Sequence, residues 1–225
     1  QDEAETAVQW QEILARADVL IQSPPLPADG DTPPHLIRCD VSAFGNAGEA
    51  GLPDDAGEAV LQAIGGMMST TGAEDGPPEF IGAPLVEFFT GVNCAAAVAA
   101  ALRVREQGGP AQRIDLSALD SSVALTGAFI GHMQLGKAHD VRAGSRHPLC
   151  CPWNAYRTED GWVLMCSSTE PHWRRIAELI GRAELTQHPD FIDTNARQAN
   201  HVAVDAAIEA WTRGRTTDEA VAAFD

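Results

Sequence analysis

The stretch Gln62–Gly91, QAIGGMMSTTGAEDGPPEFIGAPLVEFFTG, decides the fold, because its glycine- and proline-rich turns end on an acid just where a long helix should begin. The sequence from Glu87 onward, EFFTGVNCAAAVAAALRVREQ, consists mostly of good helix formers, and the run stops at Gly108-Gly109-Pro110. We therefore predict a helix that Glu87 opens and that ends near Gly108.

Glu87 would lie where a helix N-terminus has positive potential and backbone N–H groups without intrahelical partners. Such a position stabilises a carboxylate anion and any oxyanion that forms beside it. Small residues follow at Gly91, Cys94 and Ala95 to Ala97, so another backbone or a ligand can approach closely, and we expect this helix to be buried. By position alone, Glu87 is either an ordinary helix-end acid or a nucleophile.

Composition limits the function classes. The chain has 225 residues, of which 44% are hydrophobic and 21% charged, enough for one large domain or two modest ones. Fifteen Lys and Arg against 32 Asp and Glu give a net charge of -17, which argues against binding nucleic acid or an anionic membrane. We also expect no bilayer span, because Asn93 interrupts the alanine-rich run and Arg103 and Arg105 follow it.

The cysteines and histidines indicate neither a disulfide framework nor a metal site. Five cysteines form an odd set without C-x-x-C spacing, which fits a reducing cytoplasm. The histidines show no metal-ligand spacing, and no motif for nicotinamide, ATP or pyridoxal is present. His147, in a linker beside Arg146, is either a structural histidine or a contact for acyl or phosphate groups.

The rest of the chain alternates helices and strands, which is typical of an α/β fold. In the first half we expect a helix over residues 5–17, strands over 18–21, 36–41 and 112–116, and a helix over 117–135. The apolar residues on the buried face of this last helix are Val123, Leu125, Phe129 and Ile130. After a basic linker we expect the strand WVLMCS and then helices that bury Trp173, Ile176, Ala177, Ile180 and Trp211.

These segments together resemble a known family. The pattern Q-A-x-x-G-x-M-S-x-T-G, then D-G-P-P, then G-x-P and an acid followed by x-x-T-G, is similar to the family III CoA-transferases, the formyl-CoA transferase and carnitine CoA-transferase group. The later segments that match are Gly109, Gln112, Ile114 to Ser117, Leu119, Asp120, His147-Pro148, Pro152 and Asp160-Gly161.

The resemblance implies an α/β fold with a partial Rossmann-like large domain and a smaller α/β domain after it. We place the large-domain portion at residues 1–136, the linker at 137–152 and the small-domain portion at 153–225. Family members usually have a further βα segment before this region and continue beyond Asp225, so both ends are expected to be missing. Members also form intertwined homodimers.

The resemblance makes Glu87 the nucleophile, in the place of the family's aspartate. The extra methylene moves the carboxylate by about 1.5 Å, a displacement that can cost about 10²-fold in rate. In the implied reaction Glu87 attacks the thioester of an acyl-CoA to give a mixed anhydride and then a glutamyl-CoA thioester, which a second carboxylic acid resolves. Such chemistry must be protected from water, so we expect the Glu87 carboxylate to lie in a crevice without water. Coenzyme A is then a substrate, and no permanent cofactor is needed. Gly65-Gly66 and Gly76-Pro77-Pro78 are candidate walls of the site.

The family's CoA contacts fall on Ser42, Phe44 and Gly45, in the segment LIRCDVSAFGNAG. Relatives often carry a basic residue near Ser42, which this chain lacks. An ordinary turn at the end of a strand would have the same residues, so this alternative to a CoA contact stays open.

Three functions stay open at this point. The first is a CoA-transferase. The second is a non-catalytic homologue, or half of a fused protein, which the change from Asp to Glu and the missing basic residue favour. The third and minor one is an acyl-CoA racemase, whose catalytic histidine would fall near Glu58, where this chain has an acid that could act as a base.

Overall fold

The computed structural model describes residues 3–23, 32–46, 56–134 and 142–224. The chain is a mixed α/β protein that divides into two compact units, here called unit 1 (residues 1–72 and 77–139) and unit 2 (residues 73–76 and 140–225). The α/β class is as predicted. The start of the expected linker, residues 137–141, lies outside the described residues, and the domain limits stay a prediction.

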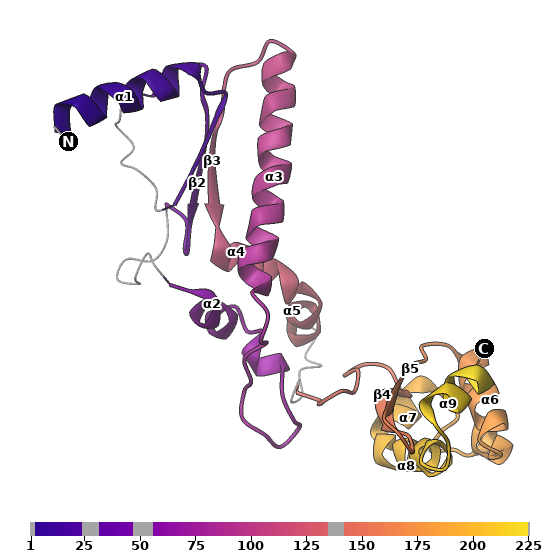
Figure 1. The fold of residues 1–225 in the computed structure, drawn as a ribbon. Helices are drawn as coiled ribbons and strands as arrows, with labels where there is room; N and C mark the ends of the chain where they lie inside the picture. The colour runs from indigo at the N-terminus through magenta and orange to yellow at the C-terminus, as the bar shows by residue number, and fades with distance from the viewer. Residues whose placement is uncertain (1–2, 24–31, 47–55, 135–141, 225) are drawn as a thin grey trace. The chain divides into compact units, whose positions relative to one another are not determined.

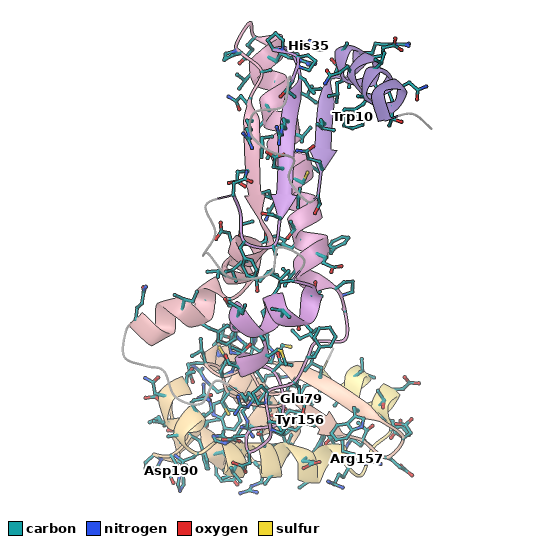
Figure 2. All side chains as sticks on the ribbon, turned by 90° about the vertical axis from the view of Figure 1, so that its left-hand side faces the viewer. Trp10, His35, Glu79, Tyr156, Arg157 and Asp190 are labelled. Carbon is teal, nitrogen blue, oxygen red and sulfur yellow. The ribbon has the colours of Figure 1, made fainter. Side chains whose placement is uncertain are left out.

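A three-stranded parallel sheet forms the middle of unit 1 (Figure 1). The strands β1 (Val19–Gln22), β2 (Ile37–Ser42) and β3 (Arg113–Ser117) lie in that order. Cys39 pairs with Ile21 on one side and with Ile114 on the other. The helix α1 (Glu3–Arg16) precedes the sheet and carries Trp10 (Figure 2). All four elements fall where the sequence predicts them.

The helix α3 (Leu85–Glu106) contacts β2 and β3 and also two short helices, α2 (Glu58–Ile64) and α4 (Ala118–Leu125) (Figure 1). It begins two residues before Glu87 and ends as predicted, where Gly108 takes a left-handed conformation (φ 86°) that favours glycine. The expectation of a buried helix is wrong, because only one face packs within the unit. Phe88 is 74% exposed, and Leu85 and Val92 are also exposed.

The expectation of no bilayer span rested on an apolar run too interrupted to cross a membrane, and that reason does not hold for α3. Among the described residues α3 is the one helix that is long and apolar enough to span a bilayer, with a mean hydropathy of 1.7 over 18 residues, of which 22% are buried. A single helix of this kind is weak evidence for a membrane protein, since its length and composition alone are tested.

The predicted helix over residues 117–135 is two helices, α4 and α5 (Gly127–Gln134). The break falls at Thr126, whose hydroxyl donates to the carbonyls of Gly65 and Val123, and Gly127 follows with its poor helix propensity. The expected apolar burial is wrong at Val123 and Leu125, which are exposed.

The buried face of α4 carries Ser121, Ser122 and Thr126 instead. Ser122 Oγ donates to the carbonyl of Leu61 on α2 at 3.1 Å. A Cβ atom added at Gly65 would lie 1.9 Å from Ser122 Oγ, so the two segments meet too closely for larger side chains. After Gly65, the short 3-10 helix η1 (Met68–Thr70) leads into the loop before α3.

Unit 2 is built around an antiparallel hairpin of β4 (Trp153–Arg157) and β5 (Trp162–Cys166). The strand β5 is the predicted WVLMCS segment, whereas β4 was not predicted. The elements that follow are α6 (Glu170–Leu179), η2 (Ala183–Gln187), α7 (Thr194–Ala199), α8 (His201–Thr212) and α9 (Thr217–Phe224).

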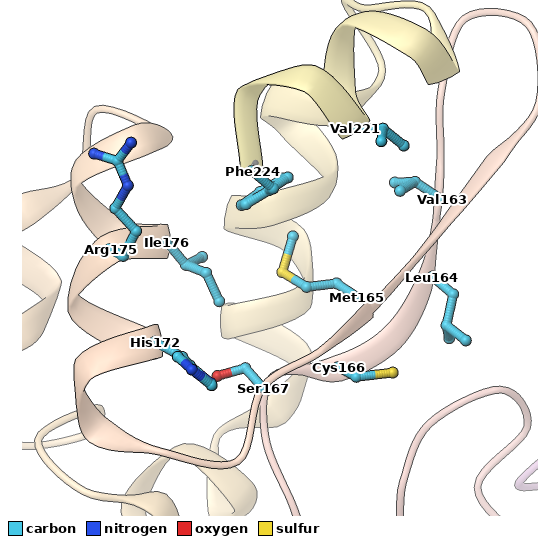
Figure 3. A pocket seen from close by; sticks show the side chains of 10 residues that line it. All are labelled: Val163, Leu164, Met165, Cys166, Ser167, His172, Arg175, Ile176, Val221 and Phe224. Atoms are coloured by element: carbon cyan, nitrogen blue, oxygen red, sulfur yellow. The ribbon is translucent and has the colours of Figure 1, made fainter.

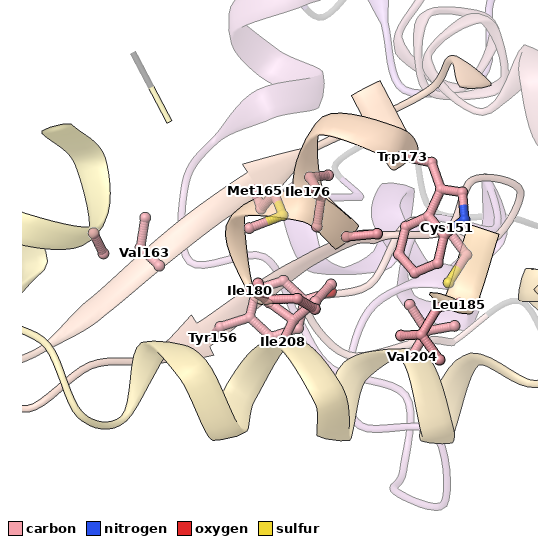
Figure 4. Packing of buried hydrophobic residues seen from close by; sticks show 12 residues of the cluster. Cys151, Tyr156, Val163, Met165, Trp173, Ile176, Ile180, Leu185, Val204 and Ile208 are labelled. Carbon is pink, nitrogen blue, oxygen red and sulfur yellow. The ribbon is translucent and has the colours of Figure 1, made fainter. Parts of the chain in front are cut away.

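The core of unit 2 lies between this hairpin and the helices α6 and α8 (Figure 4). Trp173 is 1% exposed, and Ile176, Ala177 and Ile180 are buried with it, which confirms the predicted core positions. Trp211 is only partly buried and packs at the edge of this core, with the Arg215 guanidinium 4.0 Å from its ring centre.

Candidate active site

A cavity of about 630 Å³ lies in unit 1 between the carboxyl end of β2 and the first turns of α3. Its lining is made of small, apolar and hydroxyl side chains together with one acid, Glu87. The lining residues are Ile21, Ser23, Val41, Ser42, Ala43, Ala56, Gly57, Leu61, Glu87, Thr90, Gly91, Cys94 and Ala118.

Glu87 lies in the first turn of α3, and Thr90, Gly91 and Cys94 follow it at helical spacing on the same wall of the cavity. Thr90 is buried and its hydroxyl donates to the Val86 carbonyl at 2.7 Å. The sequence pointed to Gly91 and Cys94 as small residues that let a ligand approach, but it marked Thr90 only as part of a family pattern. The spacing of Thr90 and Gly91, three and four residues from Glu87, was the signal that they share its surface.

Glu87 is exposed although it lines the cavity. The expectation that its carboxylate lies in a crevice without water is therefore wrong for this chain by itself. The physical reason is the one-sided packing of α3, because none of the described residues of unit 1 covers Phe88.

The amide groups at the start of α3 have a partner in Glu58, on α2. Glu58 Oε1 accepts from the Val86 N–H and Oε2 from the Glu87 N–H, each at 2.9 Å. Gln62 Nε2 also donates to Oε1, at 2.7 Å. Sequence reasoning expected these amides to be available to an oxyanion, and that expectation is wrong for Val86 and Glu87.

These contacts keep Glu58 ionised. Burial alone would raise its pKa, but the hydrogen bonds from Gln62, Val86 and Glu87 outweigh burial and hold the pKa of Glu58 below its usual value. A carboxylate whose oxygens already accept three hydrogen bonds is a poor proton acceptor for a substrate. The arrangement therefore does not favour Glu58 as the base of a racemase.

The predicted CoA contacts separate in the structure. Ser42 lies at the end of β2 and lines the same cavity as Glu87. Its hydroxyl accepts from the Gly45 N–H at 2.8 Å and so closes the turn after the strand. Phe44 packs against the small apolar cluster nearby, and neither Phe44 nor Gly45 lines the cavity.

Other expected features are absent from the lining residues. Neither Gly65-Gly66 nor Gly76-Pro77-Pro78 is among them, and the part of the lining that the structure describes has no Lys or Arg. Within the described parts of the chain, no group of three or more His, Cys, Asp and Glu residues could hold a metal ion.

The cysteines and His147, for which the sequence left a functional role open, make contacts within the fold. The described cysteines are all free, and Cys39 Sγ lies 3.5 Å from Cys94 Sγ between β2 and α3, where burial raises the pKa of Cys39 to about 12. His147 Nδ1 accepts from the Leu149 N–H, and its ring lies 4.6 Å from that of Trp153. These contacts support the structural interpretation of His147.

Unit 2 has a cavity of about 330 Å³ bounded by β5, α6 and α9 (Figure 3). Val163, Met165, Ile176 and Phe224 give it an apolar lining, with His172 at one side. No carboxylate is among the described residues that line it, so the cavity in unit 1 is the better candidate for a carboxylate nucleophile.

Comparison with known proteins identifies the family of this chain. The family model described as CoA-transferase family III matches residues 31–225, which include β2, β3, α3 and unit 2 beyond them. The chain belongs to CoA-transferase family III. This result confirms the resemblance inferred from Gln62–Gly91 and the later segments.

Several relatives within the family have named activities. The acetyl-CoA:oxalate CoA-transferase of Acetobacter aceti is 34% identical over 179 residues, which cover 78% of this chain and 45% of the relative. The formyl-CoA:oxalate CoA-transferase of Streptomyces coelicolor is 30% identical over 80% of this chain and 47% of its own length. The chain thus spans about half the length of the curated relatives it matches.

Solved structures support the same fold. A Mycobacterium tuberculosis protein, Rv3272, matches 98% of this chain and 60% of its own chain with a TM-score of 0.81 and 28% identity. A CAIB/BAIF family protein from Brucella suis matches 98% of this chain and 61% of its own, with a TM-score of 0.78 and 26% identity.

Proposed function

We propose that this chain supplies the nucleophile of a CoA-transferase that moves CoA from an acyl-CoA to a carboxylic acid through a covalent intermediate on Glu87. The observation that carries the proposal is the position of Glu87. Among the residues that the structure describes, it is the one acid in the lining of a cavity at the carboxyl end of β2, at the start of α3.

The chemistry proceeds by exchange at a carboxyl group. Glu87 attacks the thioester carbonyl and expels CoA thiolate, which leaves a mixed anhydride. The thiolate attacks the glutamyl carbonyl of that anhydride, releases the donor acid and forms a glutamyl-CoA thioester. The acceptor carboxylate then attacks the glutamyl carbonyl of this thioester and expels CoA thiolate, which leaves a second mixed anhydride. The thiolate attacks the acceptor's carbonyl of that anhydride, which forms the new acyl-CoA and releases Glu87.

The substrates follow the family's chemistry. Curated relatives are named for oxalate, mesaconate and glutarate among their acids, so a small carboxylic acid is the acceptor class that we propose here. Ser42, at the cavity wall, is the CoA contact that the geometry supports best, since Phe44 and Gly45 lie outside the lining.

We also propose that the enzyme works as an intertwined homodimer in the cytoplasm, without nucleic-acid or membrane partners. The exposed apolar residues Leu85, Phe88 and Val92 on α3 support an association that covers this helix. Such a partner surface would exclude water from the neighbourhood of Glu87, which the anhydride step requires.

A non-catalytic homologue that binds CoA or serves assembly is the second candidate. The observations that favour it are the exposed Glu87 in the place of the family's aspartate and the lack of Lys or Arg among the described residues of the cavity lining.

Chemical trapping separates these two candidates. Full-length protein is incubated with acetyl-CoA or succinyl-CoA and then with hydroxylamine, and the mass of the peptide that contains Glu87 is measured. We expect a hydroxamate on Glu87 in wild type and none in Glu87→Gln, with turnover reduced at least about 10³-fold. A wild-type protein that binds acyl-CoA but leaves Glu87 unmodified would establish the non-catalytic function.

A further inference from the structure

We propose that Glu58 and Gln62, one helical turn apart on α2, are positioning residues that fix the backbone at the base of Glu87. This inference rests on the proposed function, because it concerns how that nucleophile is held. Neither side chain is among the residues that line the cavity, so both would act on Glu87 through the backbone.

Glu58 holds the first turn of α3. Its two carboxylate oxygens accept separately from the amides of Val86 and Glu87, so the carboxylate fixes the N–H of the nucleophile's own residue. The helix supplies no side-chain cap of its own, since its N-cap residue is Pro84. Glu58 therefore does for α3 what a capping side chain usually does within one segment.

Gln62 holds the turn just before that helix. Its Oε1 accepts from the Ile81 N–H at 3.0 Å, while its Nε2 donates to the carbonyls of Ile81 at 3.2 Å and Ala83 at 3.3 Å. The side chain is fully buried. Because Gln62 also donates to Glu58, the two side chains form one network that fixes the backbone from Ile81 to Glu87.

The network requires an anion at residue 58. Three N–H groups converge on the two oxygens of Glu58. A glutamine there has one oxygen and an NH₂ group that would face a donor, so at least one donor would lose its partner. An aspartate keeps the charge but is one methylene too short to hold both amides. Reach and charge can thus be tested separately.

The consequence for catalysis is geometric. A glutamate nucleophile has one more rotatable bond than an aspartate, so it depends more on a fixed Cα position to aim its carboxylate. If the start of α3 moves, the carboxylate moves with it, while the rest of the cavity still binds substrate. Loss of Glu58 should therefore reduce kcat more than it raises KM.

The test compares Glu58→Gln and Glu58→Asp with Glu79→Gln in the full-length protein. Glu79 is an exposed acid in the loop before α3 (Figure 2), so its change removes a nearby charge without touching the network. Amide hydrogen exchange is followed in peptides that cover residues 81–90. The rate of adduct formation with succinyl-CoA is measured on the same samples, and circular dichroism checks the fold.

We expect exchange at Val86 and Glu87 to rise at least about tenfold in both Glu58 variants. The maximal rate of adduct formation should fall about 10- to 100-fold, while the succinyl-CoA concentration that gives half of that rate stays within about threefold. Glu79→Gln should match wild type in both measurements. If Glu58→Gln does not fold, Glu58→Asp and Gln62→Met carry the test, with the same expected direction.

Two results would overturn the proposal. The first is unchanged exchange over residues 81–90 in the Glu58 variants. The second is faster exchange with adduct formation equal to that of Glu79→Gln, which would make the network structural only. If wild type itself forms no adduct, the proposed function and the catalytic part of this inference fail together, and the exchange result still decides whether Glu58 holds the helix.

Discussion

Twelve buried residues form the core of unit 2 around Trp173 and Ile208, whereas the apolar cluster beside the cavity of unit 1 has five, none of them aromatic, among the residues described. Unit 1 instead buries polar groups, such as Asp40, Gln62 and Ser122. Apolar packing stabilises without fixing direction, while hydrogen bonds require set distances and angles. The unit with the candidate nucleophile is thus the one whose interior depends more on directional contacts.

The largest effect on stability is expected at the centre of unit 2. Trp173→Ala should lower the free energy of unfolding by about 3–5 kcal/mol, because it removes a fully buried ring and leaves a cavity. Urea unfolding followed by tryptophan fluorescence measures it, since three of the four remaining tryptophans, Trp153, Trp162 and Trp211, lie in unit 2.

Trp162→Ala is the matched control, because Trp162 is 58% exposed on β5 and should cost less than about 1 kcal/mol. If the two variants lost equal free energy of unfolding, the apolar cluster around Trp173 would not dominate the stability of unit 2. The contrast between an apolar core in unit 2 and a polar interior in unit 1 would then fail.

Unit 1 should respond most to the loss of a buried charge. Asp40 is fully buried between Arg38 and Arg113, whose guanidinium nitrogens lie 2.8 and 2.9 Å from its two oxygens. Asp40→Asn removes the buried negative charge that Arg38 and Arg113 both contact and should cost about 3 kcal/mol. Hydrogen exchange of β2 peptides at pH 7 measures the loss, with Glu12→Gln on the exposed face of α1 as the control.

The difference in stability between wild type and Asp40→Asn should depend on pH. Burial would raise the pKa of Asp40, but hydrogen bonds from Arg38, Gln22 and Arg113 outweigh it and hold the pKa below its usual value. A lowered pKa stabilises the folded state above the unfolded pKa of about 3.9, and that contribution is lost as the pH falls through the folded value. The difference between wild type and Asp40→Asn should therefore shrink below about pH 4, and a constant difference would contradict this account.

The smallest effect is expected where α2 meets α4. Gly65→Ala places a Cβ 1.9 Å from Ser122 Oγ and should cost about 1–3 kcal/mol through overpacking. Adding Ser122→Gly should recover part of the loss, because it removes both close atoms. Gly131→Ala on α5, where an added Cβ meets nothing within 4 Å, should be neutral or slightly stabilising. Similar losses at both glycines, measured by hydrogen exchange of α2, would rule out close packing as the cause.

Much of the fold could be predicted where local patterns and burial agree. The alternation of helix and strand through β3 and the helical spacing of Trp173 and Ile176 follow from propensity and periodicity, and the structure confirms both. The prediction was wrong where burial did not follow hydrophobicity. On α4 the serines face inward and Val123 faces solvent, because Gly65 leaves room only for small side chains there.

Part of the candidate site could likewise be predicted from the sequence, and part could not. The sequence by itself determined the family, the helix after Glu87 and the acid at its start, because helix propensity, glycine stops and motif spacing are properties of contiguous residues. Only the tertiary structure decided that Ser42 joins Glu87 in one cavity, that Phe44 and Gly45 do not, and that Glu58 takes up the helix amides. Glu58 lies 28 and 29 residues before the two N–H groups that it accepts from. Whether it reaches them depends on how α2 and α3 pack, which no local sequence pattern specifies.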